Sequence, residues 1–180
     1  MAPRSVSSHA MLTIGKRPAA ADVVDLLLDC HERIRSFTAL AQRLARAPGT
    51  PPAEIADAAT KVRRYFADAL PLHARDEEES MVPRLRGRGA EVERELAEMQ
   101  REHGEHEPLL ARLVALCDAL AADPARHAAL APELDQVATA LAGHFAAHLD
   151  REERVLFPAV RALPEAERAA MVRELRARRT

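Results

Sequence analysis

Apolar residues recur at intervals of three and four along most of this 180-residue chain, which is the periodicity of amphipathic helices. The first such stretch covers residues 22–47 and has its apolar positions at Val23, Leu27, Ile34, Phe37, Leu40 and Leu44. Similar stretches cover about 51–84, 91–122 and 132–163, and a shorter one begins at 164. The pattern predicts four long helices and a short final helix.

Proline and glycine separate these stretches. Residues 48–52 read Pro-Gly-Thr-Pro-Pro, and residues 87–89 read Gly-Arg-Gly, so turns are predicted at both places. Residues 123–132 are bracketed by two further prolines, which predicts a connecting turn in which His127 is solvated. Pro71 falls inside the second helix and predicts a kink there.

Long helices joined by short connections predict an all-α, up-down-up-down four-helix bundle. We expect the bundle to cover residues 22–163, with residues 164–180 forming a C-terminal helix packed on it. Residues 1–21 mix Ser, Pro, Gly and Arg, and we expect a partly ordered N-terminal arm.

Composition narrows the class of protein. Aromatic residues make up 3% of the chain and tryptophan is absent, which favours helices over strands. With 26 Lys and Arg against 28 Asp and Glu, the charge argues against a nucleic-acid or anionic-membrane partner. The two cysteines, Cys30 and Cys117, do not form a C-x-x-C motif, and no apolar run is long enough to cross a membrane. These features predict a cytoplasmic protein.

A repeated motif points to the chemistry. Residues 73–83 and 148–158 both read His-x-x-x-Glu-Glu, then four residues, then Pro, and the second copy lies 75 positions after the first. The same shift takes His31 to His106. A repeat that preserves ligand-type residues suggests a site built from two similar halves.

The spacing within the motif has a physical reading. Residues four apart on an α-helix differ by about 40° around the axis, so His73 shares a face with Glu77, as does His148 with Glu152. An unpaired carboxylate in an apolar core costs several kcal/mol, roughly, so inward-facing glutamates need positive charge between them. Mixed imidazole and carboxylate ligands suit iron, and also manganese or zinc.

At this point the sequence resembles the hemerythrin-like (HHE cation-binding) domain, over about residues 22–160. The resemblance rests on His31, on the His73/Glu77 pair, on Glu102-His103, and on the His148/Glu152 pair followed by Leu156-Phe157-Pro158. It implies a non-haem centre of two bridged iron ions. By the same resemblance, Glu77 and Glu152 would bridge the irons, and His31, His73, His148 and a histidine of the third helix would be terminal ligands.

The third helix offers two candidates for that ligand. The family motif favours His103, whereas the internal repeat favours His106, and both are candidate ligands. Hemerythrins proper have His-x-x-x-His on this helix and an Asp five residues after the fourth-helix histidine. Here the spacing is His103-x-x-His106, and Glu152 comes four residues after His148, so dioxygen-carrier behaviour does not follow from the resemblance.

Several neighbours of these residues receive other assignments. We expect Glu78, Glu79 and Glu153 at the surface or behind the ligands, since only the first Glu of each run lies four residues after a histidine. His144 is expected in the core or behind His148, and Tyr65 is expected to pack.

The leading functional hypothesis is a di-iron protein that binds or senses dioxygen, nitric oxide or peroxide at an open iron position. One alternative is a di-iron redox enzyme, for example one that reduces peroxide, or an iron donor for iron-sulfur cluster repair. Another is an interaction bundle with a vestigial site. The expected partner is a small diatomic molecule or peroxide.

Overall fold

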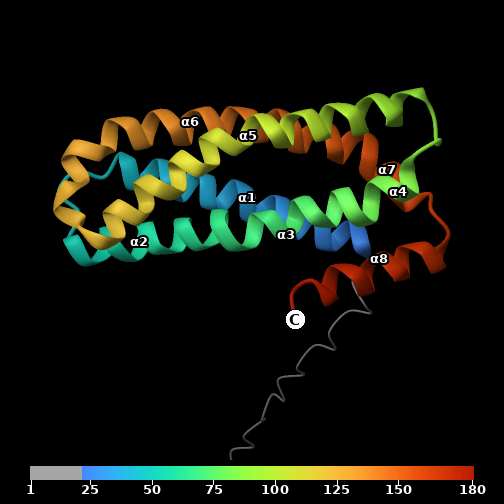
Figure 1. Cartoon of the computed structure of the whole chain (residues 1–180), viewed down its shortest axis with the longest axis horizontal. Helices are drawn as coiled ribbons and strands as arrows, with labels where there is room; N and C mark the ends of the chain where they lie inside the picture. Colours follow the sequence, from blue (N-terminus) through green and yellow to red (C-terminus); the bar gives the residue numbers. More distant parts are fainter. Residues whose placement is uncertain (1–21) are drawn as a thin grey trace, which may run out of the picture.

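The computed structural model describes residues 22–180, which are helical and contain no strand (Figure 1). The predicted N-terminal arm, residues 1–21, lies outside the described residues. The elements, in chain order, are α1 (Val23–Ala45), α2 (Pro52–Arg64), η1 (Tyr65–Ala69), α3 (Leu70–Arg75), η2 (Asp76–Met81), α4 (Val82–Leu85), α5 (Ala90–Ala122), η3 (Pro124–Arg126), α6 (His127–Arg151), η4 (Glu152–Leu156), α7 (Phe157–Arg161) and α8 (Glu165–Ala177). None of these helices is long and apolar enough to cross a membrane.

These elements form four long antiparallel helices and a short fifth one, as the sequence pattern predicted. The second long helix runs from α2 to α4 and the fourth from α6 to α7 (Figure 1). α1 packs against α2 and α6, and α5 packs against the same two neighbours. The four long helices therefore surround a common centre, and α8 covers one end of the bundle, where it packs against α1 and η2.

The start of the fourth helix was predicted wrongly. It begins at His127 instead of at residue 132, and Pro132 lies inside it. His127 is buried, not solvated, and its Nε2 lies 2.6 Å from the carbonyl oxygen of Leu44. A proline near the start of a helix removes a single backbone hydrogen bond, and the packing of the buried turn around His127 outweighs that loss.

The apolar core is divided into two clusters. One contains Ile34, Phe66 and Leu149, and the other contains Leu27, Met81 and Leu156, together with Met171 and Leu175 of α8. Along each long helix the candidate ligands lie between residues of one cluster and residues of the other, so the predicted site forms a polar layer between two apolar ones. Bulk water is kept out from both directions along the bundle.

Three π turns interrupt the helices, and each is followed closely by a proline. η1, η2 and η4 end two residues before Pro71, Pro83 and Pro158. In each turn the residue just before the proline donates its N–H five residues back: Leu70 to Tyr65, Val82 to Glu77 and Phe157 to Glu152. Proline has no N–H and crowds the carbonyl four residues before it, and a local shift of register accommodates both effects.

Candidate metal centre

Six of the seven predicted ligand residues converge at the centre of the bundle. Their ligand atoms form two groups, within each of which all atoms lie within 4.8 Å of one another. One group contains His31, His73, Glu77 and Glu152, and the other contains His103 and His148 with the same two glutamates. Each group thus offers two imidazoles and two carboxylates.

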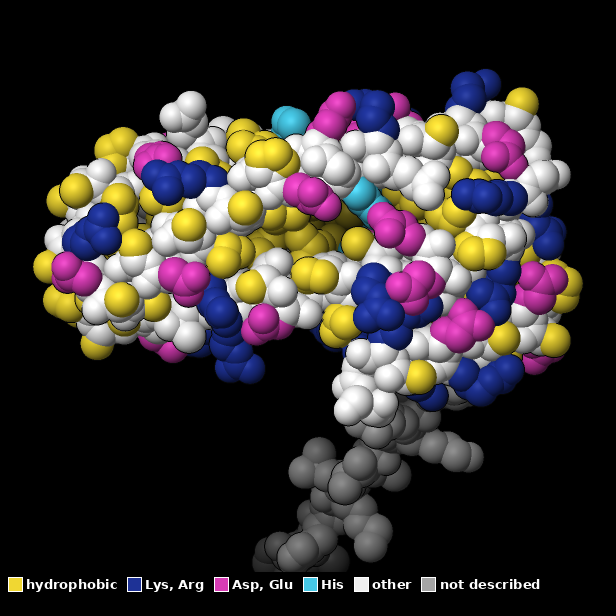
Figure 2. Space-filling view, in the orientation of Figure 1, with side chains coloured by type: hydrophobic (Ala, Val, Ile, Leu, Met, Phe, Trp, Pro, Cys, Tyr) yellow, Lys and Arg dark blue, Asp and Glu magenta, His cyan; other side chains and the backbone are white. Residues whose placement is uncertain are grey.

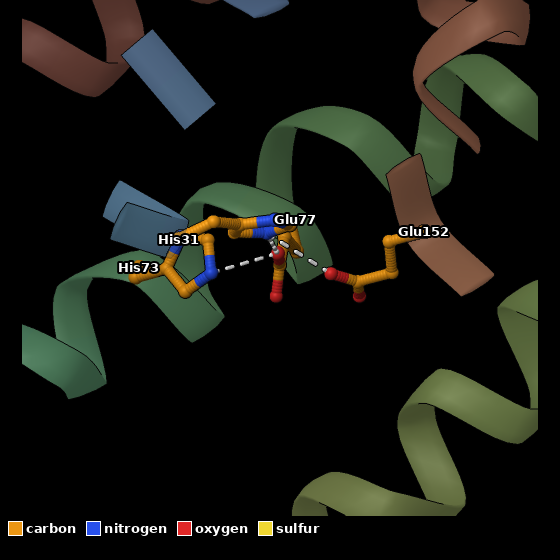
Figure 3. Close-up of side chains that lie close together, drawn as sticks. All are labelled: His31, His73, Glu77 and Glu152. Carbon is orange, nitrogen blue, oxygen red and sulfur yellow. Dashed lines mark ion pairs between the residues drawn. The ribbon is translucent and has the colours of Figure 1, made fainter. Parts of the chain in front are cut away.

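The first group joins three of the long helices (Figure 3). His31 comes from α1, His73 from α3, and Glu152 from η4. His31 Nε2 lies 3.2 Å from Glu152 Oε2 and 3.9 Å from Glu77 Oε1. His73 Nε2 lies 3.0 Å from that same oxygen of Glu77.

The second group uses the other oxygen of each carboxylate. His103, from α5, places Nε2 3.3 Å from Glu77 Oε2. His148, from α6, places Nε2 3.4 Å from Glu152 Oε1. Each glutamate therefore presents one oxygen to each group, which is the arrangement of a carboxylate that bridges two ions. Both bridging candidates lie in the π turns that precede the prolines of the repeat.

The chemistry of these donors fits a metal pair. Glu77 and Glu152 are fully buried, and none of their four carboxylate oxygens has a hydrogen-bond partner within residues 22–180. His31 Nε2 and both ring nitrogens of His73 are unpaired in the same way, although some lie close to the carboxylates. Buried polar atoms are rarely left unpaired, and seven of the nine such side-chain atoms found in residues 22–180 belong to this centre, so its donors fit a pair of cations.

Carboxylates behind the cluster orient three of the four histidines. His31 Nδ1 lies 2.8 Å from Glu153, and His103 Nδ1 lies 2.8 Å from Glu78. His148 Nδ1 lies at the same distance, 2.8 Å, from Glu102. An Nδ1–H that donates to a carboxylate fixes the ring and leaves Nε2 free to bind metal.

His73 is the exception, because its Nδ1 has no hydrogen-bond partner among residues 22–180. The neighbouring group is the thiol of Cys30, on α1. Burial raises the pKa of this thiol, but interaction with His73 and the positive charges of Arg179 and Arg33 outweigh burial, so the pKa lies below its ordinary value. His73 thus differs from the other three histidines in having a thiol instead of a carboxylate as its neighbour.

The pKa values show how the histidines and carboxylates of the two groups act on one another. Burial alone would lower the pKa of His31, but the adjacent carboxylates of Glu152 and Glu77 raise it to about 9. The pKa of His103 is raised to about 9 despite burial, chiefly by Glu77. Burial also opposes ionisation of Glu77, yet His73, His103 and His31 hold its pKa well below the ordinary value. The histidines and the carboxylates therefore stabilise each other's charged forms.

His106, the seventh candidate, belongs to neither group. Its ring packs against His148, with ring centroids 5.4 Å apart, and against Phe145 at 5.1 Å. The family motif thus selected the third-helix histidine that the structure places at the cluster, and the internal repeat selected its neighbour. His144, expected in the core or behind His148, is exposed.

Of two further residues near the cluster, Tyr65 lies as the sequence predicted, whereas the role of Glu102 was not predicted. The Tyr65 ring stacks on Phe37 at 4.2 Å, as its packing assignment expected, and its hydroxyl donates to the carbonyl oxygen of Cys30 at 3.4 Å. Glu102 received no role of its own from the sequence. Its position next to a candidate ligand is the signal that could have identified it. Glu102 comes one residue before His103, just as Glu78 and Glu153 each come one residue after a bridging candidate.

The fold and the site together define a helical-bundle protein with paired His/Glu clusters suitable for binding two cations. The model of the hemerythrin HHE cation binding domain matches residues 22–128, more than half of the chain, and the chain belongs to that family. The matched range ends before His148 and Glu152, which the fold brings back to the other four residues. A comparison with curated proteins found no match to the chain.

Proposed function

We propose that this protein is a non-haem di-iron protein that binds or senses dioxygen, nitric oxide or peroxide at an open iron position. The observation that carries the proposal is the division of each glutamate between two histidine pairs, with one oxygen of Glu77 and Glu152 directed to each group. His31 and His73 would hold one ion and His103 and His148 the other, with both glutamates shared.

The donor set supports iron over harder cations. Two imidazoles and two carboxylate oxygens per ion suit iron, manganese or zinc, whereas magnesium and calcium prefer all-oxygen sites. Four protein donors leave positions free on a six-coordinate ion. The iron pair, when bound, would supply those positions together with one- or two-electron redox chemistry.

The protein's own residues prepare the site for that chemistry. The apolar clusters on both sides exclude bulk water, and Glu153, Glu78 and Glu102 fix three imidazoles by their Nδ1 atoms. Arg35 in turn binds Glu153 at 2.7 Å, and Arg151 binds Glu102. These chains of hydrogen bonds reach the surface, so the ligand geometry is fixed from outside as well as by packing.

Metal analysis of protein purified without chelator tests the proposal. We expect close to two irons per chain and an absorption band that appears reversibly with oxygen or nitric oxide. Protein that contains no transition metal after growth and reconstitution with ferrous iron would overturn it.

A second candidate is a di-iron redox enzyme, such as one that reduces peroxide, and an iron donor for iron-sulfur cluster repair is its variant. The observation in favour of an enzyme is a cavity of about 250 Å³ beside the cluster, because a diatomic molecule fills only a small part of it. Irreversible oxidation with multiple turnovers of peroxide would favour the enzyme, and transfer of iron to an acceptor protein would favour the donor.

A further inference from the structure

The cavity beside the cluster has a largely apolar wall. It lies between the second long helix and α5, and Phe66, Leu70, Leu110 and Phe145 line it. Figure 2 shows the corresponding hollow, with hydrophobic side chains in its wall and a histidine at its edge. An apolar cavity of about 150 Å³ can hold a benzene molecule, so one of about 250 Å³ has room for a ring and a short branch.

The inner end of this cavity is the metal centre. His73, His103 and His148, which together contribute to both groups, also line the cavity. A molecule seated against the apolar wall would therefore have one end beside the cluster.

His106 supplies a polar contact inside the cavity. Its side chain lines the cavity, the residue is 3% exposed, and it makes no hydrogen bond within residues 22–180. Its ring packs against Phe145 and His148, which also line the cavity. A neutral imidazole has one N–H donor and one acceptor nitrogen, which matches a head group that both accepts and donates, such as a hydroxyl or hydroperoxyl group.

The charge at the rim disfavours anions. Glu78 and Glu107 line the outer part of the cavity, and both are exposed. A carboxylate ligand would have to pass two negative charges, whereas a neutral molecule would not.

We propose that this cavity binds a neutral organic hydroperoxide, or the alcohol derived from it, with the apolar body against Phe66 and Leu110 and the oxygen head at His106. The choice of hydroperoxide rests on the proposed redox function, but the binding itself requires no metal. The inference names a substrate class that hydrogen peroxide and diatomic gases do not share, since these have no apolar body.

The test measures binding of 2-phenyl-2-propanol, an unreactive alcohol, to metal-free and iron-loaded protein by ligand-observed NMR. We expect saturable binding to both forms, displacement of the alcohol by cumene hydroperoxide from the metal-free form, and much weaker binding of benzoate. His106→Leu should weaken alcohol binding by up to about tenfold, the loss of one hydrogen bond. Ala74→Leu, which fills the cavity from α3, should abolish it, and Asp150→Asn, an exposed change outside the cavity, should leave it unchanged.

Circular dichroism checks that each variant is folded, and His106→Asn replaces His106→Leu if the latter is not. Alcohol that fails to bind the metal-free wild type, or that cumene hydroperoxide does not displace, overturns the inference. Two irons per chain without alcohol binding would leave the proposed function intact and remove this one. Alcohol binding by protein that never takes up metal would support this inference and remove the proposed function.

Discussion

The Nδ1 atom of His31 lies 2.8 Å from Oε1 of Glu153, the residue that follows the bridging candidate Glu152 in the sequence. Glu78, which follows Glu77, makes the equivalent contact with His103. Each Glu-Glu pair thus serves two purposes: its first member faces the cluster, and its second fixes a histidine on another helix. Four helices are thereby connected through two short segments.

The sharing of Glu77 and Glu152 predicts unequal effects on metal content. Glu152→Ala removes a donor from both groups, so we expect less than half a metal ion per chain. His31→Ala removes a donor from one group alone, so we expect about one ion per chain. Elemental analysis of the purified variants measures both values.

His144→Ala is the matched control for that series, because His144 is exposed and belongs to neither group. It should retain the wild-type metal content. Equal metal content in Glu152→Ala and the wild type would refute the shared assignment.

The contact between Glu153 and His31 predicts a change in metal affinity at unchanged stoichiometry. Glu153→Gln leaves all six candidate ligands in place but weakens the acceptor that orients His31. We expect metal affinity to fall by about 10- to 100-fold, as is typical when such partners are removed. Competition with a chromophoric chelator measures the affinity. Asp150→Asn, an exposed change whose partner is Arg154, should have no effect.

The raised pKa values predict that metal binding releases protons. His31 and His103 have pKa values of about 9 without metal, so both rings are protonated at pH 7.5 and must each lose a proton to bind through Nε2. We expect release of at least about two protons per chain and an affinity that rises with pH. Calorimetry in buffers of different ionisation enthalpy measures the release, and heats that do not depend on the buffer would contradict it.

The same groups predict how the stability of the metal-free protein depends on pH. Their folded-state pKa lies above the ordinary histidine value of 6.5, so the stabilisation is fully present below pH 6.5 and is lost as pH rises to about 9. We expect the free energy of unfolding to fall by about 3 kcal/mol for each of the two groups over that window. Urea unfolding with EDTA present measures it. His103→Gln should flatten the profile, and a wild-type profile that rises with pH would disprove the prediction.

The C-terminal helix predicts a further stability effect. Asp76, fully buried beside Glu77, is paired with Arg178 at 2.8 Å and with Arg179. Replacing both arginines by alanine leaves a buried charge unpaired, which costs on the order of 3–5 kcal/mol. Urea unfolding should show a smaller loss when Asp76→Asn is added to the double variant. The exposed neighbour change Arg176→Ala should be neutral, and additive losses would argue against the pairing.

Much of the fold could be predicted because hydrophobic periodicity is a local property. The third helix was expected at about 91–122 and lies at Ala90–Ala122, and the first differs from its prediction by one or two residues at each end. The start of the fourth helix could not be predicted this way. The proline pattern favoured a turn up to residue 132, whereas packing around His127, including its contact with Leu44, decided in favour of helix.

The π turns were missed for a related reason. The sequence showed Pro83 and Pro158 at equal places in the repeat, and regular helix was predicted at both, with a kink at Pro71 alone. The helix instead forms a π turn at Glu77 and another at Glu152. Whether such a turn forms depends on which backbone hydrogen bonds the chain can make while both glutamate side chains stay directed inward.

The sequence by itself determined which residue types face the centre, because His and Glu four apart on an amphipathic helix must share a face wherever the helix lies. Only the tertiary structure decided which histidine of the third helix belongs to the cluster, because His103 and His106 both point broadly inward and the choice depends on the rotation and height of α5 against α3 and α6. The same placement decided that each carboxylate divides its oxygens between two histidine pairs, since that requires distances between helices that no local pattern contains.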